Sequence, residues 1–297
     1  MLGFLRSYTK RFLLTNSPVI YTLLFKVFQR GKQILGKDVS DDILKVANFT
    51  KKGFYEFHLD DVKFDMYLNP INGWVDSSIF LYGSLEPKFL SLIRKNIKKD
   101  DVFFDIGANI GQHGLYASNF CKSVYSFEPI QRLYNQLELS INRNNFNNIH
   151  AFNIGLGNEE KEIPIYSDAA NVGGSSVLIS AGKFLEQVIQ IKKLDDFLLN
   201  NPTEVNMVKI DVEGFELEVL LGARKMFEKY KPKLLIEFSP PIYNTISSTR
   251  GEEIYLFLSG IYSKINNVGL DLEISQEIYS YNDLLHLNHH TNLWCTN

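Results

Sequence analysis

The sequence of 297 residues is poor in cysteine and in long apolar runs, and both scarcities narrow what the chain can be. Its two cysteines, Cys121 and Cys295, are too few for a disulfide scaffold or a cysteine zinc site, which favours a reducing, cytoplasmic setting. No run reaches the roughly eighteen apolar residues that a membrane-spanning helix needs. The small net charge of −3 argues against a general nucleic-acid binder.

Acidic residues are absent from the first 37 positions. That segment carries a charge of +7, so the remainder carries −10. Its basic residues are interleaved with apolar ones, as in an amphipathic helix interrupted near Pro18. Such a segment suits either a helical cap on the core or peripheral contact with an anionic membrane surface, and we favour the cap.

Two partly alternating runs flank Asp60 and Asp61, so residues 53–68 are predicted to form a hairpin. We therefore assign residues 1–80 to an N-terminal segment of helices and a β-hairpin, and residues 81–297 to the main domain. Residues 158–192 contain short strand-like runs and read as a β-rich insertion within that domain.

From Val102 onward, short apolar runs alternate with amphipathic helical patterns. Such alternation predicts a parallel sheet with helices on both faces, which is a doubly wound, Rossmann-like α/β fold. The strands are predicted at residues 102–107, 123–129, 148–157, 205–214 and 232–240, with a last one in the tail 289–297.

The predicted carboxyl ends of these strands are polar, and ligands bind there in open α/β sheets. After the first strand, the turn from Asp105 to Gly114 contains Gly107 and Gly111, which allow a tight bend and a close approach to a ligand. At the end of the second strand, the Glu128 carboxylate is placed to accept both hydroxyls of a ribose.

Three more acids end the later strands. Asp211 and Glu213 are two residues apart, so in strand geometry their side chains point the same way, and Gly214 allows the turn that follows. Glu237 ends the fifth predicted strand. Each acid alone could be a charge favoured by a helix N-terminus, but three at one sheet edge indicate a functional site.

The motifs FFDIGANIGQHGLYAS, YSFEP, NIGLGN, GGSSV, KIDVEGFELEVLLGA and LIEFSP, in this order, resemble the FkbM family of S-adenosylmethionine-dependent methyltransferases. The resemblance covers about residues 80–240. It implies a class I methyltransferase fold with a mostly parallel, seven-stranded sheet. The residues Gln112 and His113 depart from the family pattern, which has apolar or aromatic residues after the second glycine.

The resemblance also implies roles for individual residues. Residues Asp105, Gly107, Asn109 and Gly111 would hold the methionine part of the cofactor, and Glu128 its ribose. Asn153 and Ile154 would border the adenine, whereas Asp211 and Glu213 would face the reacting methyl group. The family typically methylates oxygen, so the expected acceptor is a hydroxyl of a sugar, glycan or secondary metabolite.

A hydroxyl nucleophile needs a proton acceptor within hydrogen-bond reach. Asp211, Glu213 and Glu237 are the candidate bases, and we favour Asp211 or Glu213. His113 is the best-placed histidine, whereas His289 and His290 are assigned to the surface. The same acids offer oxygen ligands to Mg²⁺, although a site without metal is favoured.

Two other classes of protein remain open. An NAD(P)-dependent oxidoreductase also has a glycine-rich turn and an acid after the second strand, but Asn109 stands where its motif usually has a glycine. A non-catalytic module could retain the methyltransferase fold without the chemistry. The joint presence of the glycines, Glu128, Asp211 and Glu213 argues against that module.

Overall fold

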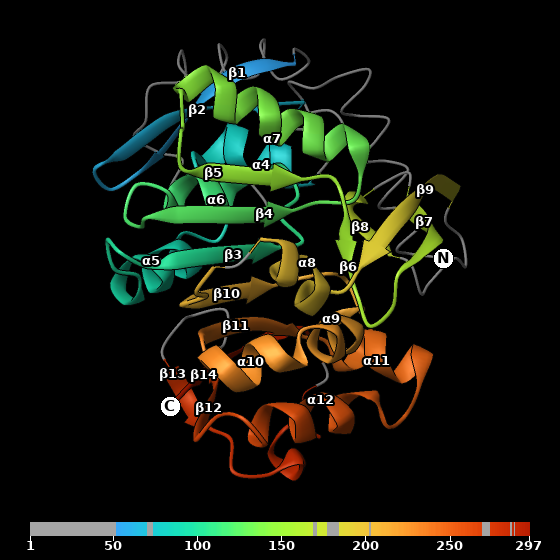
Figure 1. Ribbon diagram of the computed structural model, residues 1–297. Coiled ribbons are helices and arrows are strands. Elements are labelled where there is room, and N and C mark those ends of the chain that lie inside the picture. Colours follow the sequence, from blue (N-terminus) through green and yellow to red (C-terminus); the bar gives the residue numbers. More distant parts are fainter. Residues whose placement is uncertain are drawn as a thin grey trace, which may run out of the picture.

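The computed structural model describes residues 52–69, 74–168, 171–176, 184–201, 203–268, 274–285, 287 and 289–297. The basic segment 1–37 lies outside these residues. The described chain is built around one central sheet with helices on both of its faces, and Figure 1 shows the succession of strands through the molecule.

The central sheet has the strand order β13-β12-β14-β11-β10-β3-β4-β5. The strands β3, β4, β5, β10 and β11 are parallel, as the strand–helix alternation predicted. The bounds are β3 (Val102–Ile106), β4 (Ser123–Phe127), β5 (Ile149–Phe152), β10 (Met207–Ile210), β11 (Lys233–Phe238), β12 (Lys264–Val268), β13 (Ile274–Glu277) and β14 (Thr291–Thr296).

The structure confirms the Rossmann-like α/β fold, and among the described residues the central sheet has eight strands where the family resemblance implied seven. The additional strand is β13, which pairs antiparallel with the edge strand β12. Its four residues, ISQE, include one apolar side chain, so no hydrophobic pattern marks it. The tail does form a strand, β14, but this strand lies inside the sheet, antiparallel to both β11 and β12.

Two apolar clusters lie on the two faces of the sheet because successive side chains of a strand alternate. In β3, Phe103 belongs to one cluster and Phe104 to the other, and both are fully buried. The helices are α4 (Trp74–Tyr82), α5 (Pro87–Asn96), α6 (Gln112–Ala117), α7 (Gln131–Asn144), α8 (Leu194–Asn200), α9 (Glu216–Gly222), α10 (Arg224–Tyr230), α11 (Pro240–Ile246) and α12 (Arg250–Ser259), with a 3₁₀ turn, η1 (Tyr281–Asp283).

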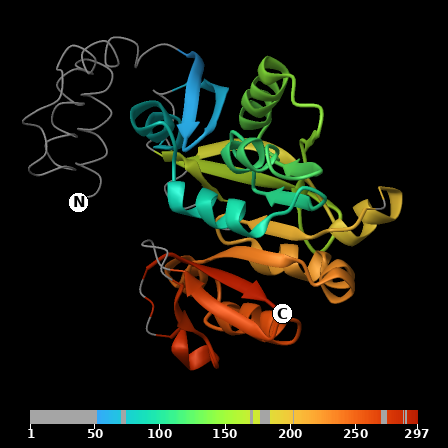
Figure 2. The same cartoon turned by 90° about the vertical axis from the view of Figure 1, so that its left-hand side faces the viewer.

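The hairpin expected at residues 53–68 is present as β1 (Gly53–Leu59) and β2 (Val62–Leu68), shown in blue in Figure 2. Side chains of α7 bind its backbone: the Ser140 hydroxyl accepts from the Tyr67 amide at 2.9 Å, and Asn144 accepts from the Asp65 amide at 2.8 Å. The buried side chains of the hairpin join the apolar cluster on the α7 side of the sheet. The domain boundary at residue 80 stays a prediction.

The insertion is β-rich, as expected. Strands β6 (Gly155–Leu156), β7 (Lys161–Asp168), β8 (Asn171–Ser176) and β9 (Phe184–Lys192) form a second sheet in the order β6-β9-β7-β8. The single strand predicted at residues 148–157 is therefore wrong, because β5 and β6 belong to different sheets. The break falls at Asn153, whose side-chain amide donates to the carbonyls of Glu128 and Pro129 at 2.9 and 3.0 Å.

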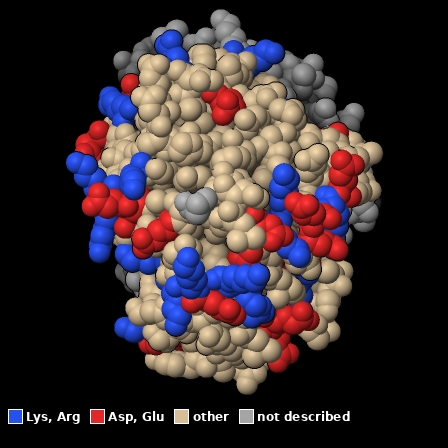
Figure 3. All heavy atoms as spheres, viewed as in Figure 1, with Lys and Arg blue, Asp and Glu red and all other residues tan. Residues whose placement is uncertain are grey.

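The outer surface mixes charges of both signs where the helices face solvent. Figure 3 shows basic and acidic side chains together over α10, where Arg224 and Glu228 approach to 3.7 Å. Exposed pairs of this kind contribute little to stability. The fold therefore depends on its two apolar clusters rather than on its surface charges.

The contact between α9 and the turn after β6 leaves no room for a side chain at Gly222. A methyl group there would lie 1.8 Å from the carbonyl oxygen of Gly157. We expect Gly222→Ala to lower the free energy of unfolding by about 2 kcal/mol or more, as overpacking does. Chemical denaturation measures this. Gly53→Ala is the matched control, because its methyl group meets nothing within 4 Å and a change of about 0.5 kcal/mol or less is expected. Equal stability of the two variants would contradict the packing.

Candidate functional site

A cavity of about 270 Å³ opens at the carboxyl ends of β3, β4, β10 and β11. It is the position at which an open α/β sheet binds its ligand. Most of the residues predicted from the sequence line it: Gly107, Asn109, His113, Glu128, Ile154, Asp211, Glu213 and Glu237. Asp105, Gly111 and Asn153 are outside the lining and support it from behind through hydrogen bonds or close packing.

The glycine-rich turn adopts backbone conformations that only small or special residues take easily. Gly107 has a φ of 76° and Gly111 a φ of 88°. A methyl group on Gly107 would lie 1.8 Å from the carbonyl oxygen of Asp211, and one on Gly111 would lie 2.2 Å from Leu137. Asn109 also has a positive φ, 54°. Gly107 lets the turn pass close to the loop after β10, and Gly111 lets it pass close to α7.

Glu128 is held rigidly at the cavity wall. One carboxylate oxygen accepts a hydrogen bond from the Asn109 amide and the other from the Ile130 amide, both at 2.8 Å. Burial raises the pKa of Glu128 to about 7, and the two amides act in the opposite direction. Each oxygen has acceptor capacity left after these bonds and the residue lines the cavity, so this carboxylate fits the predicted task of accepting two ribose hydroxyls.

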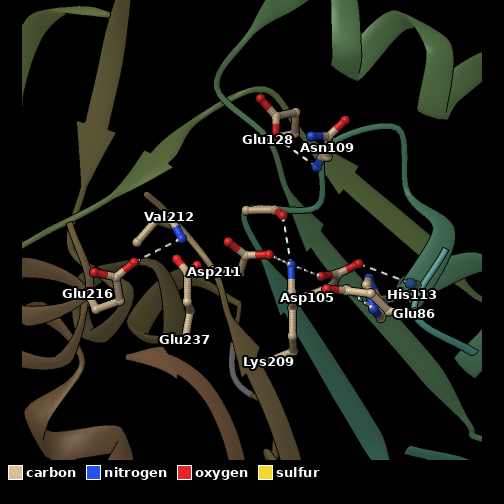
Figure 4. Close-up of polar contacts among 12 residues, drawn as sticks. Glu86, Asp105, Asn109, His113, Glu128, Lys209, Asp211, Val212, Glu216 and Glu237 are labelled. Atoms are coloured by element: carbon tan, nitrogen blue, oxygen red, sulfur yellow. Dashed lines mark hydrogen bonds and ion pairs between the residues drawn. The ribbon is translucent and has the colours of Figure 1, made fainter. Parts of the chain in front are cut away.

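Lys209 stands at the centre of the site, and the sequence reasoning missed it (Figure 4). Its ammonium donates to the Gly107 carbonyl at 2.9 Å and lies 3.4 Å from Asp211 and 3.6 Å from Asp105. Burial alone would lower the pKa of Lys209, but the two carboxylates outweigh burial and raise it. The sequence does mark Lys209 as unusual, because it is the one charged residue in the apolar strand β10 and lies two residues before Asp211.

Asp211 and Glu213 both line the cavity, but not for the predicted reason. Because β10 ends at Ile210, the two acids lie in the loop beyond it, and Glu213 has a φ of 54°. The alternation of strand side chains therefore does not apply to them. Two buried side chains hold the backbone of this loop at Gly214. Glu216 accepts from the Gly214 amide at 3.1 Å, and Arg250 donates to the Gly214 carbonyl at 2.7 Å.

The carboxyl groups of Glu213 and Glu237 are held in an environment that disfavours their charge. Burial raises the pKa of each, and the neighbouring charge of Asp211 adds to the effect. One oxygen of Glu237 is buried without a hydrogen-bond partner among the described residues. These two acids therefore tend to hold protons until a cation approaches.

Glu86 is a second cavity residue that the sequence did not reveal. It precedes α5 with a left-handed backbone, φ 49°. The residue before Glu86, Leu85, is held by the Gln112 side chain, which accepts from the Leu85 amide at 2.6 Å and donates to the Leu85 carbonyl at 2.8 Å. Desolvation raises the pKa of Glu86 to about 7, with a further increase from Asp211. No pattern marks this residue, because it enters the site from a loop.

The histidines are placed differently from each other. His113 lines the cavity, as expected, but burial lowers its pKa to about 3, so it is neutral at ordinary pH. His290, assigned to the surface, has a side chain that is 54% exposed, yet its Nδ1 lies 2.8 Å from the Ser239 hydroxyl and 3.3 Å from Glu237. The surface assignment of His290 therefore missed its contact with a cavity carboxylate.

Among the residues placed by the structure, no three or more His, Cys, Asp or Glu side chains are grouped as a metal site would require. The helices within the same residues are all too short or too polar to cross a membrane.

The sequence of residues 105–264 matches the profile of the Methyltransferase FkbM domain. "Methyltransferase 1" of Beauveria bassiana is 27% identical over 146 residues, which cover 41% of this chain and 59% of that relative. The hexuronic acid methyltransferase AglP of Haloferax volcanii is 28% identical over 137 residues, or 46% of this chain and 56% of that relative. The chain thus spans less than two thirds of either relative.

Among solved structures, the methyltransferase FkbM from Methylobacillus flagellatus superposes with a TM-score of 0.44 at 16% identity. The superposition covers 87% of this chain and 60% of that one.

The central position of Lys209 leads to a prediction about stability. Lys209→Met leaves Asp105 and Asp211 near each other without a cation, so the free energy of unfolding at neutral pH should fall by about 3 kcal/mol or more. Urea denaturation measures the loss, which should shrink at acidic pH as the carboxylates take up protons. Lys225→Met on the exposed side of α10 is the control, with an expected change within about 0.5 kcal/mol. A loss no larger than that of the control would refute the central role.

The raised pKa values of Glu213 and Glu237 predict a dependence of stability on pH. The folded protein holds these protons at pH values where the unfolded chain has released them, so stability falls as pH rises above the ordinary glutamate value. The double variant Glu213→Gln, Glu237→Gln should lose less stability between about pH 5 and about pH 9 than the parent chain. Thermal melting across this range tests it, and parallel curves would contradict the assignment.

Proposed function

The chain belongs to the FkbM methyltransferase family, and from this we propose that it transfers the methyl group of S-adenosylmethionine to a hydroxyl oxygen of a sugar, glycan or other small metabolite. The observation that carries the proposal is one cavity lined both by the rigid Glu128 and by the acids Asp211, Glu213 and Glu237. The hexuronic acid methyltransferase among the relatives supports a sugar acceptor.

The cofactor half of the cavity is formed by the glycine-rich turn and Glu128. S-adenosylmethionine, when bound, supplies a methyl group activated by a positively charged sulfur. The Glu128 oxygens would accept the ribose hydroxyls, and the apolar side chains of Ile154 and Phe127 would border the adenine. Because the Asn109 and Ile130 amides fix the carboxylate, little side-chain freedom is lost on binding.

The acceptor half contains the proton chemistry. A hydroxyl becomes a better nucleophile when a carboxylate takes its proton during transfer. Asp211, Glu213 and Glu237 all line this part of the cavity, and the raised pKa values of the two glutamates bring their basicity closer to that of a useful base. A positive charge in the cavity favours the ionised carboxylates. His113, being neutral and buried, is left to pack and orient.

Ligand binding separates this proposal from its alternatives. We expect S-adenosylhomocysteine to bind and NADH not to bind in an isothermal titration, because Asn109 replaces a glycine of the dinucleotide motif. Glu128→Gln should weaken S-adenosylhomocysteine binding about tenfold or more, since the amide loses one acceptor for the ribose. Glu228→Gln on the surface of α10 is the control.

Incubation with S-adenosylmethionine and candidate sugars, with and without a metal chelator, tests the reaction itself. Mass spectrometry should show a product that is heavier by one CH₂ unit. Binding of NADH alone would favour the oxidoreductase. Failure to bind any S-adenosyl ligand would favour a module without catalysis.

A further inference from the structure

The position of β14 brings a distant residue to the candidate site. Because β14 lies between β11 and β12 and runs antiparallel to both, it begins beside the carboxyl end of β11. Glu237 of β11 pairs with Asn292 of β14, and His290 immediately precedes that strand. His290 is thereby placed next to Glu237, although 53 residues separate them in the sequence.

The His290 ring connects a cavity carboxyl with solvent. Its Nδ1 lies 3.3 Å from one oxygen of Glu237 and 2.8 Å from the hydroxyl of Ser239, which is fully buried. The Glu237 side chain is only 16% exposed and lines the cavity, whereas that of His290 is 54% exposed. One ring nitrogen of His290 therefore contacts a buried carboxyl group, and much of the rest of the side chain is exposed to solvent.

The geometry points to a route by which the acceptor proton leaves the cavity. We propose that Glu237 takes this proton and that His290 passes it from Glu237 to solvent. The inference rests on the proposed function, since it concerns the proton released by the acceptor hydroxyl. It also selects Glu237 over Asp211 and Glu213 as the base favoured by the surroundings.

The proton balance of the relay is simple. On transfer, the sulfur–methyl bond of S-adenosylmethionine would break and release S-adenosylhomocysteine. The acceptor oxygen would gain the methyl group, and the proton of its broken O–H bond would bind the Glu237 carboxylate. The proton then moves from Glu237 to Nδ1 of His290, while the proton on Nε2 passes to water. In the receiving tautomer Nδ1 has one lone pair, so it takes the proton from Glu237 when the Ser239 hydroxyl turns its hydrogen away, and that hydroxyl then accepts from the new N–H. Proton exchange with water at the exposed ring restores the starting tautomer.

The charges around this pair favour uptake of the acceptor proton by Glu237. The groups that act on Glu237 and its neighbour Glu213 from the surrounding elements are Asp211, Glu216, Lys209, Glu86 and His290 itself. Acids predominate among them, so a proton is readily accepted inside the cavity. Return of Glu237 to its charged form then requires a partner that can exchange the proton with water, which the exposed ring supplies.

The experiment compares His290→Gln with His289→Gln, a change at the exposed neighbouring histidine. For His290→Gln we expect kcat to fall about tenfold in dilute buffer and to recover with added imidazole, as proton transfer predicts. KM for the acceptor and the affinity for S-adenosylhomocysteine should stay within about twofold of the parent values. His289→Gln should behave like the parent enzyme.

A second measurement needs no turnover. In an NMR titration of the histidine ring protons, Glu237→Gln should move the titration midpoint of His290 and leave that of His289 in place. An unmoved midpoint, or a His290→Gln enzyme with parental kcat across the pH range, overturns the relay while leaving methyl transfer intact. Absence of methyl transfer in the parent protein, with any hydroxyl acceptor, overturns the proposed function and the relay with it.

Discussion

The buried ammonium of Lys209 is the interaction on which the rest of the site depends. It joins the carbonyl of Gly107, at the end of β3, to the carboxylates of Asp105 and Asp211. Two adjacent parallel strands are thus fixed at the point where their loops diverge to form the cavity. The close approach of Gly107 to Asp211, which tolerates no side chain, is the steric counterpart of the same constraint.

The cavity formed in this way has two electrostatic regions. Around Glu128, backbone amides satisfy the carboxylate and fix its direction, so this region is suited to recognising hydroxyl groups. Around Asp211, Glu213 and Glu237, acids outnumber Lys209, and burial suppresses part of the charge of the two glutamates. A cationic group entering the second region would meet carboxylates able to release protons in response.

The sequence predicted the repeating parts of the fold well, because buried parallel strands and amphipathic helices have clear hydrophobic periods. It predicted the acids and glycines at the strand ends for the same reason, since their places follow from the strands. It did not predict β12, or β13, whose four residues lack an apolar pattern. It also did not predict the break at Asn153, which depends on side-chain bonds to another loop. Glu86 and His290 were missed because tertiary folding alone brings Glu86 to the cavity and His290 to Glu237.

The internal position of β14 has a consequence for folding. Until this strand is inserted, β11 and β12 each present an unpaired edge, and the carboxyl of Glu237 lacks its histidine neighbour. The pairing of β14 with β11 joins segments more than fifty residues apart, and such contacts form late because a long loop must close first. Before that insertion the two free edges of β11 and β12 are the places where chains would associate incorrectly.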